Sequence, residues 1–340
     1  MHKHVRPTTS LAIAVLFLLP TPAARAQKGQ FTVPMRVFAD LLKIPPEPPA
    51  VRPTVHSTRE EEGLIIEDVS WPSIDGDTAP AFIVRPGKAT GRLPTVVCLH
   101  GSSTNREVNI APKFGYAEWA RYGTDRKSTT LFGWARELAR RGYVTLSLTQ
   151  RGLDNRAPDT EALDKALLVH GRNVMGTIVY EIRQAVTYLR QRPEVDPEKI
   201  GMTGISFGGI TTFYTWLVDD RIAAAAPICG GVGSVQEFIE HGSRGYHGIY
   251  WWVPDMLTKG DHGEFAAAMA PRPLMLWAPR NDIGMPNEGI DRFLEVAAPA
   301  YKRAGAADRL IVHRPPGEHA LTIESFEAAF QFFEKFLKGN

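Results

Sequence analysis

The stretch Lys199–Phe213, KIGMTGISFGGITTF, decides how the rest of the chain is interpreted. Its first seven residues are typical of a short buried strand, and the residues after Gly209 are typical of a helix. Ser206 therefore stands where a strand turns into a helix, with Gly204 and Gly208 on either side. Such a turn forces a serine into a sparsely populated backbone conformation and requires very small neighbours. The pattern G-x-S-x-G also fits an ordinary glycine-rich loop, but in this setting it predicts a nucleophilic serine.

From about Leu64 onward, strand-like and helix-like segments alternate. The strand-like runs are short and rich in Val, Ile and Leu: LIIEDVSW, PAFIVRP, PTVVCLH, YVTLSLT, KIGMTGI, AAAAPIC, PLMLWAP and RLIVHRP. Longer segments with helical spacing, such as 131–141, 176–192 and 289–305, separate the later runs. Continuous apolar runs indicate strands buried on both faces, and helices between them indicate parallel crossovers. We therefore expect an α/β fold: a mostly parallel central sheet with helices on both faces and an antiparallel N-terminal edge.

The first 26 residues have the pattern of a secretory signal peptide. A basic start at 2–6 precedes an apolar core, Leu11–Leu19, and residues 24–26, Ala-Arg-Ala, predict cleavage before Gln27. The apolar core is too short to span a bilayer comfortably. No Arg-Arg pair precedes it, which favours the general secretory route. We expect a secreted or periplasmic mature protein without a membrane span; an uncleaved anchor or a buried helix is the alternative.

The mature chain divides into a Pro-rich segment, 27–62, and one α/β domain, 63–340. Five prolines in Lys43–Pro53 favour an extended segment that makes few hydrogen bonds. Two long segments, near 102–130 and 230–260, interrupt the alternation and carry Trp, Tyr and Gly. Both follow strand C-termini, where open parallel sheets bind ligands, so we expect these insertions to wall a pocket.

Composition argues against several classes of protein. The 340 residues carry a net charge of +2 and no long basic run with aromatic residues, which argues against nucleic acid as a partner. The chain lacks C-x-x-C, H-E-x-x-H and His-rich motifs, so we expect no metal site and no cofactor. Cys98 and Cys229 are the only cysteines, and both end apolar runs. We interpret them as buried strand-end thiols, although an exported protein could pair them.

Two residues late in the chain could activate Ser206. A serine hydroxyl is a weak nucleophile until a base removes its proton. His319, in VHRPPGEHALT, follows the last strand and is the candidate base. Asp282, in LMLWAPRNDIGMP, follows the preceding strand and would orient the histidine. The carboxyl ends of parallel strands share one sheet edge, so these residues should meet; a surface histidine and a local turn aspartate are the alternatives.

The charge on a tetrahedral intermediate requires two preorganised donors. The N–H of Phe207, directly after the nucleophile, is one candidate. The other is the N–H of Ser102, with Ser103 as a near alternative, in the loop after the run PTVVCLH. His100 in the same loop is expected to be structural.

The segment from about Pro94 to Leu337 resembles the α/β-hydrolase superfamily. Within it, the chain resembles the dienelactone-hydrolase-like and acetyl-xylan-esterase-like branch, which borders prolyl-oligopeptidase-type catalytic domains. The motifs that carry this resemblance are CLHGSS, LARRGYVTLSLTQRG, RPEVDPEKIGMTGISFGG, AAMAPRPLMLWAPRNDIGMP and PPGEHALT. By the resemblance, Ser206, Asp282 and His319 fall on the triad positions, in the chain order of that superfamily.

Three features depart from the related families. Thr149-Gln150-Arg151-Gly152 replaces the usual Asp before Arg-Gly, so a local hydrogen-bond arrangement should differ. A serine nucleophile instead of cysteine argues against true dienelactone hydrolysis. Fewer than a hundred residues precede the core, which argues against a β-propeller and thus against an oligopeptidase-type peptidase.

The sequence thus predicts an exported serine carboxylesterase that works through an acyl-enzyme. By the resemblance, its substrate is a small-molecule or carbohydrate ester, with acetylated carbohydrate as the first expectation. Tyr250, Trp251 and Trp252 either line the substrate pocket or pack beneath the second insertion. Two alternatives stay open: a serine peptidase or amidase, and a catalytically silent binding module on the same fold.

Overall fold

The computed structural model describes residues 35–45, 49–74, 76–116, 131–154, 156, 158–242 and 245–339. The predicted signal peptide and its cleavage site lie outside these residues. Within the described ranges, no helix combines the length and the apolar character that crossing a bilayer requires.

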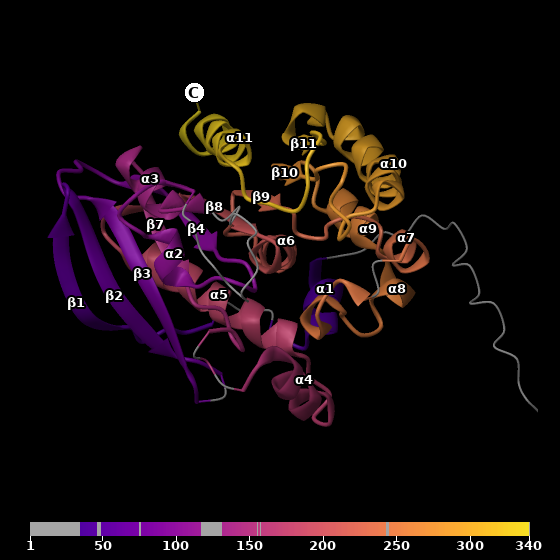
Figure 1. Ribbon diagram of the computed structural model, residues 1–340, viewed down its shortest axis with the longest axis horizontal. Helices are drawn as coiled ribbons and strands as arrows, with labels where there is room; N and C mark the ends of the chain where they lie inside the picture. The colour runs from indigo at the N-terminus through magenta and orange to yellow at the C-terminus, as the bar shows by residue number, and fades with distance from the viewer. Residues whose placement is uncertain are drawn as a thin grey trace, which may run out of the picture. The chain divides into compact units, whose positions relative to one another are not determined.

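In the described part of the chain, nine strands form a central sheet in the order β1-β2-β3-β7-β4-β8-β9-β10-β11 (Figure 1). Their bounds are β1 Thr54–Glu61, β2 Leu64–Pro72, β3 Thr78–Pro86, β4 Leu93–Leu99, β7 Val144–Leu148, β8 Val195–Ile205, β9 Ala224–Ile228, β10 Leu274–Trp277 and β11 Leu310–His313. The pairs β1–β2, β2–β3 and β3–β7 are antiparallel, and the five pairs from β7–β4 to β10–β11 are parallel. The sheet is mostly parallel with an antiparallel N-terminal edge, which confirms the predicted α/β fold.

Helices lie between most of the later strands. Their bounds are α1 Met35–Leu42, α2 Arg106–Asn109, α3 Trp134–Arg140, α4 Thr160–Leu168, α5 Val174–Gln191, α6 Phe207–Val218, α7 Val235–Glu240, α8 Met256–Lys259, α9 His262–Ala268, α10 Asn287–Arg303 and α11 Ile323–Phe333. Short 3₁₀ turns cover Ile249–Trp251 and Ala307–Arg309, and a π turn, Glu334–Lys338, continues α11. Two further strands, β5 Gly115–Tyr116 and β6 Leu131–Phe132, pair with each other.

The glycines of β8 show that helices cover both faces of the sheet. A Cβ atom on Gly201 would lie 2.8 Å from the Phe333 ring of α11. A Cβ atom on Gly204 would lie 2.5 Å from the Gly208 carbonyl oxygen of α6. Positions an odd number apart on a strand point to opposite faces. Helices α11 and α6 therefore pack on opposite faces of β8 (Figure 1).

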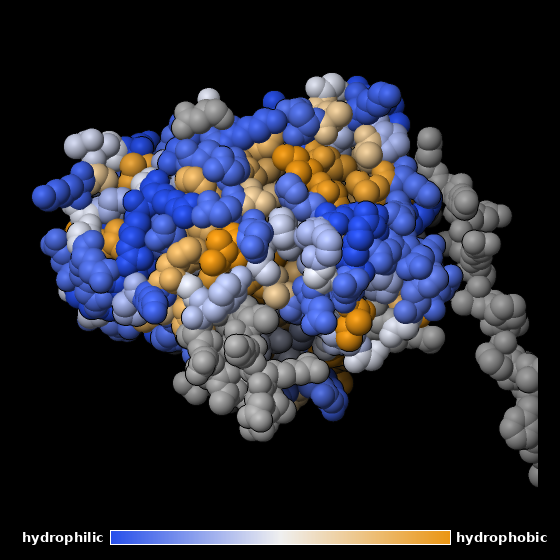
Figure 2. Space-filling model, turned by 45° about the horizontal axis from the view of Figure 1, so that its top comes forward, coloured by the Kyte–Doolittle hydropathy of each residue, from blue (hydrophilic) through white to orange (hydrophobic). Residues whose placement is uncertain are grey.

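Three of the later strands, β7, β9 and β10, are buried along their whole length, as the continuous apolar runs predict. By contrast, the face in Figure 2 is largely hydrophilic, and apolar residues gather there in separate patches.

The sheet begins ahead of residue 63, where the sequence places the start of the domain. β1 joins β2 through Glu62 and Gly63, whose φ angles of 52° and 76° are both positive. Such a two-residue turn matches the twist of a hairpin. Almost every residue of β1 is exposed. The strand therefore lacks the apolar alternation by which a strand is recognised in a sequence.

Helix α1 lies within the Pro-rich segment 27–62, just before the stretch Lys43–Pro53 for which an extended conformation is predicted. The Phe38 ring packs 4.9 Å from the ring of Tyr214 on α6 and 4.8 Å from the ring of Phe265 on α9. Phe38 is 1% exposed, so this aromatic contact anchors the N-terminal helix in the core.

Two glycines let α6 begin close to the ends of two strands. A Cβ atom on Gly208 would overlap the Leu99 carbonyl at the end of β4, and one on Gly209 would lie 2.8 Å from the Ile228 carbonyl oxygen of β9. No larger residue fits at either position without a backbone shift. The start of α6 is therefore fixed by direct contact between backbones.

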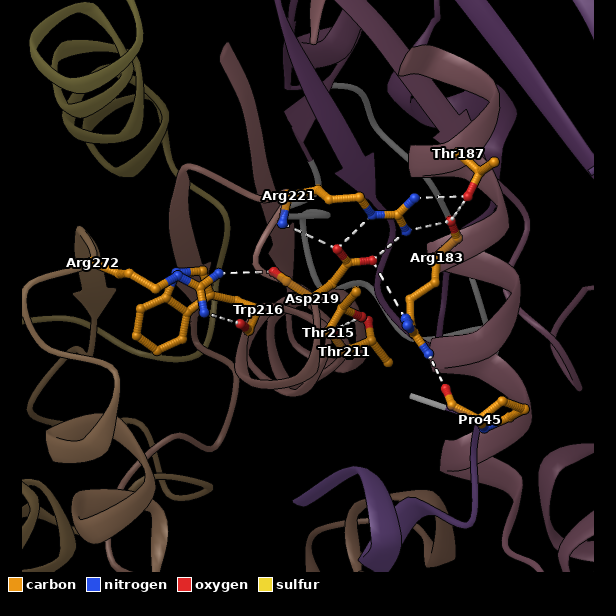
Figure 3. Close-up of polar contacts among 9 residues, drawn as sticks. All are labelled: Pro45, Arg183, Thr187, Thr211, Thr215, Trp216, Asp219, Arg221 and Arg272. Atoms are coloured by element: carbon orange, nitrogen blue, oxygen red, sulfur yellow. Dashed lines mark hydrogen bonds and ion pairs between the residues drawn. The ribbon is translucent and has the colours of Figure 1, made fainter. Parts of the chain in front are cut away.

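The end of α6 is fixed by a buried carboxylate (Figure 3). Arg221 donates from Nε and Nη2 to the two carboxylate oxygens of Asp219, at 2.7 and 2.5 Å. Arg183 of α5 donates from Nε to Asp219 Oδ2 at 3.4 Å and from Nη1 to the Pro45 carbonyl at 2.5 Å. Asp219 thus connects α6 and α5, and Arg183 extends the connection to the segment after α1.

Arg272 donates hydrogen bonds to backbone carbonyl groups at the same end of α6. Its Nη1 donates to the Trp216 carbonyl at 2.7 Å and its Nη2 to the Asp219 carbonyl at 2.8 Å. Burial lowers the pKa of Arg272 to about 10. A guanidinium with this pKa stays charged at neutral pH, and a cation at a helix C-terminus opposes the negative end of the helix dipole.

We expect Asp219→Ala to destabilise the fold by about 3–5 kcal/mol, because it leaves buried arginine charge without its carboxylate. Urea unfolding followed by circular dichroism measures the change. Asp220→Ala is the matched control, since Asp220 is adjacent and exposed, and it should change stability little. Equal unfolding midpoints for the two variants would contradict the anchoring role of Asp219.

Candidate active site

Ser206 lies at the turn between β8 and α6, where the sequence places it. Its φ of 56° and ψ of −115° fall in a region that residues with side chains rarely occupy. Its N–H donates to the Ile228 carbonyl at 2.9 Å, and its own carbonyl accepts from Gly209 N–H at 2.8 Å. A conformation of this kind costs of order 1–3 kcal/mol and persists only where its surroundings fix it. The backbone contacts at both ends of the turn do so here.

Asp282 and His319 form a direct pair at the same sheet edge. His319 Nδ1 donates to Asp282 Oδ2 at 2.8 Å, and Gly284 N–H donates to Asp282 Oδ1 at 2.9 Å. The Asp282 side chain is fully buried, whereas that of His319 is 25% exposed. With Nδ1 as the donor, Nε2 of the neutral imidazole carries no proton and can act as a base.

The loops that carry this pair hydrogen-bond to each other. Arg280 N–H donates to the Pro315 carbonyl at 2.9 Å, and Asn281 N–H donates to the Gly317 carbonyl at 3.0 Å. The contact between Asp282 and His319 is thus supported by backbone bonds just before both residues.

A cavity of about 350 Å³ is lined by both Ser206 and His319. The predicted insertions supply much of its wall. The residues from the first insertion are Ser102, Ser103, Thr104, Val108 and Asn109, and those from the second are Tyr246, His247 and Tyr250. This confirms the expectation that the two insertions wall a pocket.

A buried polar chain ties the second insertion to α6. The Tyr214 hydroxyl lies 2.9 Å from His262 Nε2 and 3.3 Å from the Trp251 carbonyl oxygen, and Gly233 N–H donates to His262 Nδ1 at 3.4 Å. Burial lowers the pKa of His262. A neutral imidazole that accepts at Nδ1 and donates at Nε2 satisfies these contacts.

The structure places only one of the three predicted aromatic contacts in the cavity wall. Tyr250 lines the cavity. Trp251 is 1% exposed and stacks on His247, with ring centroids 4.3 Å apart. Trp252 packs edge-on against Trp251 and lines a separate hollow beside α8. Both tryptophans thus pack within the insertion, because its interior must be filled by large apolar rings.

Sequence reasoning missed two residues of this wall. The Tyr246 ring lies 5.7 Å from the His319 ring and covers Gly284, where a Cβ atom would leave it no room. His247 Nε2 lies 2.8 Å from the Gly284 carbonyl oxygen, and burial lowers the pKa of His247 to about 4. The insertion has no regular periodicity, so no pattern in the sequence could locate these side chains.

His100 is structural, as expected, and Gln150 explains why. Gln150 N–H donates to His100 Nε2 at 3.1 Å, and Gln150 Nε2 donates to the His100 carbonyl at 2.7 Å. Thr211 of α6 donates to Gln150 Oε1 at 2.6 Å. Burial lowers the pKa of His100 to about 4, so the ring stays neutral. The glutamine in place of the usual aspartate therefore connects the loop after β4 with α6.

The two candidate oxyanion donors belong to the two elements that this connection joins, α6 and the loop after β4. Phe207 is the first residue of α6, and its ring meets the Tyr250 ring edge-on at 4.2 Å. Ser102 and Ser103 both line the cavity next to Gly101. The first N–H groups of a helix have no partner within the helix and suit developing negative charge.

Comparisons with known proteins agree with this architecture. Residues 120–253, which include Ser206 but neither Asp282 nor His319, match the sequence profile of the Dienelactone hydrolase family. A Bacillus subtilis (strain 168) protein named "Putative hydrolase YtaP" is 29% identical over 281 residues, which cover 82% of this chain and 90% of that protein.

Solved structures of esterases share the fold. A glucuronoyl esterase from Solibacter usitatus has a TM-score of 0.67 at 14% identity, covering 88% of this chain and 91% of that one. An acetyl xylan esterase from Paenibacillus sp. R4 has a TM-score of 0.60 at 19% identity, covering 89% and 92%. The chain therefore has the α/β-hydrolase fold, and its match to the dienelactone hydrolase family confirms the resemblance that the motifs predict.

Proposed function

We propose that this protein is an exported serine carboxylesterase in which Ser206, His319 and Asp282 form the catalytic triad. The observation that carries the proposal is that the strained Ser206 and the Asp282-paired His319 line the same cavity. A nucleophile, a base and a group that orients the base are the components of acyl transfer through a covalent intermediate.

In the first half of the reaction, Ser206 Oγ attacks the carbonyl carbon of the ester. His319 Nε2 accepts the hydroxyl proton, and Asp282 stabilises the imidazolium that forms. The tetrahedral intermediate then collapses, the bond to the alcohol breaks, and His319 returns the proton to the departing oxygen. The acyl group stays on Ser206.

In the second half, water replaces the alcohol. His319 takes a proton from the water, the hydroxide attacks the acyl carbon, and Ser206 regains its proton as the acid departs. The N–H groups of Phe207 and Ser102 hold the negative oxygen in both halves, with Ser103 N–H as the alternative to Ser102. Loss of one such donor lowers turnover by about 10²–10³.

An ester is the substrate class that the comparisons favour. The esterases with this fold named above include acetyl xylan and glucuronoyl esterases. A cavity of about 350 Å³, walled partly by Tyr246 and Tyr250, suits a small acyl group beside a sugar ring. We infer an acetylated carbohydrate as the substrate. Peptidase or amidase activity and silent binding are the competing outcomes of the tests below.

Export rests on the first 26 residues. A basic start, an apolar core and an Ala-Arg-Ala site together favour cleavage after Ala26 and a secreted or periplasmic product. N-terminal sequencing of the protein from the extracellular or periplasmic fraction tests this assignment.

Ser206→Ala should reduce p-nitrophenyl acetate hydrolysis by roughly 10⁴-fold or more, because it removes the nucleophile. A fluorophosphonate probe should label the wild-type protein at Ser206 and leave the variant unlabelled. Ser57→Ala, an exposed position on β1, is the matched control and should keep full activity. Undiminished hydrolysis in Ser206→Ala would refute the assignment, and a wild-type protein without any adduct would favour a silent binding module.

Asp282→Asn should lower kcat by about 10⁴-fold while the protein stays folded, because an amide at this position favours the wrong histidine tautomer. Steady-state kinetics on p-nitrophenyl acetate measure the effect. Asp220→Asn, which changes an exposed carboxylate, is the control. A loss smaller than tenfold would show that Asp282 does not orient the base.

Acetylated xylo-oligosaccharides should have higher kcat/KM than short acyl esters of simple alcohols, and aminoacyl amides should be the poorest substrates. Tyr250→Ala should lower kcat/KM on the sugar esters by about 3–10-fold, since an aromatic contact contributes about 0.5–1.5 kcal/mol. Trp252→Ala is the control, because Trp252 faces the separate hollow. A preference for the amides would favour the peptidase alternative.

A further inference from the structure

Cys229 lies directly behind the pair formed by Asp282 and His319. Its Sγ, a carboxylate oxygen of Asp282 and a ring nitrogen of His319 all lie within 4.8 Å of one another. The thiol also lies 3.5 Å from the carbonyl oxygen of Ala320, the residue after His319. Cys229 is 1% exposed, so its thiol is buried next to Asp282 and His319.

The backbone directs the thiol to this position at a conformational cost. Cys229 has a φ of 48°, in the left-handed region that normally selects glycine. Its N–H donates to the Trp277 carbonyl at 2.9 Å, which fixes the residue between the ends of β9 and β10. A glycine at this position would avoid the strain. The turn itself therefore does not require the Cys229 side chain.

The three donors form a recognisable ligand set. A thiolate, an imidazole nitrogen and a carboxylate oxygen are ligands of Zn²⁺, with bonds of about 2.0–2.3 Å, and the thiolate selects soft or borderline cations over Mg²⁺ and Ca²⁺. Ligand atoms already within 4.8 Å of one another need only a modest shift to share one ion. His319 is 25% exposed and lines the cavity, which gives an ion a route in.

We propose that Cys229, Asp282 and His319 form an inhibitory site for a soft or borderline divalent cation such as Zn²⁺ or Cd²⁺. The thiol of Cys229 loses its proton to solvent and binds as a thiolate. The Nδ1 proton of His319 moves to Nε2, and Nδ1 binds the ion in its place. Asp282 contributes one oxygen, and cavity water completes the coordination.

An ion bound at this site prevents His319 from acting as the base, although Ser206 is not one of its ligands. An imidazole that carries its proton on Nε2 cannot accept the proton of the serine hydroxyl. The Asp282 carboxylate is simultaneously diverted from His319 to the ion. Removal of the ion by a chelator restores the original tautomer, so the inhibition is reversible. The proposal uses the positions of Asp282 and His319 and does not depend on which substrate the protein hydrolyses.

The second cysteine gives the experiment its control. Cys98 is the only other cysteine of the chain, and it lies buried in β4 with its Sγ 3.6 Å from the Val96 carbonyl oxygen. Among the described residues, Cys98 belongs to no group of close metal-binding side chains. Cys98→Ala and Cys229→Ala therefore remove the same atom from a plain strand and from the proposed site.

The test titrates the purified protein with Cd²⁺ at constant pH and follows the ultraviolet charge-transfer absorption of a cadmium–thiolate bond. Wild type and Cys98→Ala should show this absorption with one equivalent of Cd²⁺, and Cys229→Ala and Cys229→Ser should not. Ser206→Ala should also show it, although it has no esterase activity under the proposed function. Binding is thus measured independently of catalysis, and absence of the absorption in wild type would overturn the proposal.

Inhibition is measured in parallel with Zn²⁺ and Cd²⁺, each variant being compared with its own metal-free rate. The metal concentration that gives half inhibition should rise by roughly tenfold or more in both Cys229 variants. Loss of a group that merely supports a metal ligand already lowers metal affinity by about 10–100-fold. It should stay unchanged in Cys98→Ala, and Mg²⁺ should have no effect at the same concentrations. Equal sensitivity of wild type and the Cys229 variants would show that the ions act elsewhere.

Discussion

The contact between the start of α6 and the carbonyl ends of β4 and β9 is the constraint on which the site depends. Gly208 and Gly209 bring the backbone of α6 against those carbonyls, and no side chain fits between them. Ser206 can hold its strained conformation because the elements on both sides of it cannot move apart. The hydrogen bonds of Gln150 to His100 and Thr211 fix the neighbouring loop in the same frame. The nucleophile is thus positioned by backbone packing.

The base is positioned by a second arrangement of the same kind. Asp282 and His319 lie on loops after β10 and β11, and backbone hydrogen bonds join these loops just before the two residues. Neighbouring parallel strands end at the same edge of the sheet. Asp282 and His319 therefore lie in contact although they are 37 positions apart in the chain. Two rigid units, each built on the sheet, then face one cavity.

How far the sequence predicts this structure depends on the kind of signal. The buried strands and the turn at Ser206 were predictable, because apolar runs and glycine spacing report local requirements directly. β1 was not, because its exposed and charged residues carry no apolar alternation. The same limit applies to the cavity wall. The sequence leaves open whether Trp251 contacts substrate or packs beneath the insertion, and in the structure Trp251 is buried in the insertion, whereas the Tyr246 ring lies next to His319. Irregular segments place their side chains through tertiary contacts that no periodic pattern records.

The buried histidines around the site have a consequence for the response of the fold to acid. Burial lowers the pKa of His100 and His247 to about 4 and lowers that of His262 as well, whereas an unfolded chain returns these rings to an ordinary pKa near 6.5. Between about pH 6.5 and pH 4 these histidines are therefore protonated in the unfolded chain and largely unprotonated in the folded chain. Folding stability falls as the medium is acidified through this window, by up to about 1.4 kcal/mol per pH unit for each such histidine. These buried imidazoles, of which His247 lines the cavity, thus limit the stability of the fold in acid, and the first residues of the chain predict a protein that works outside the cytoplasm.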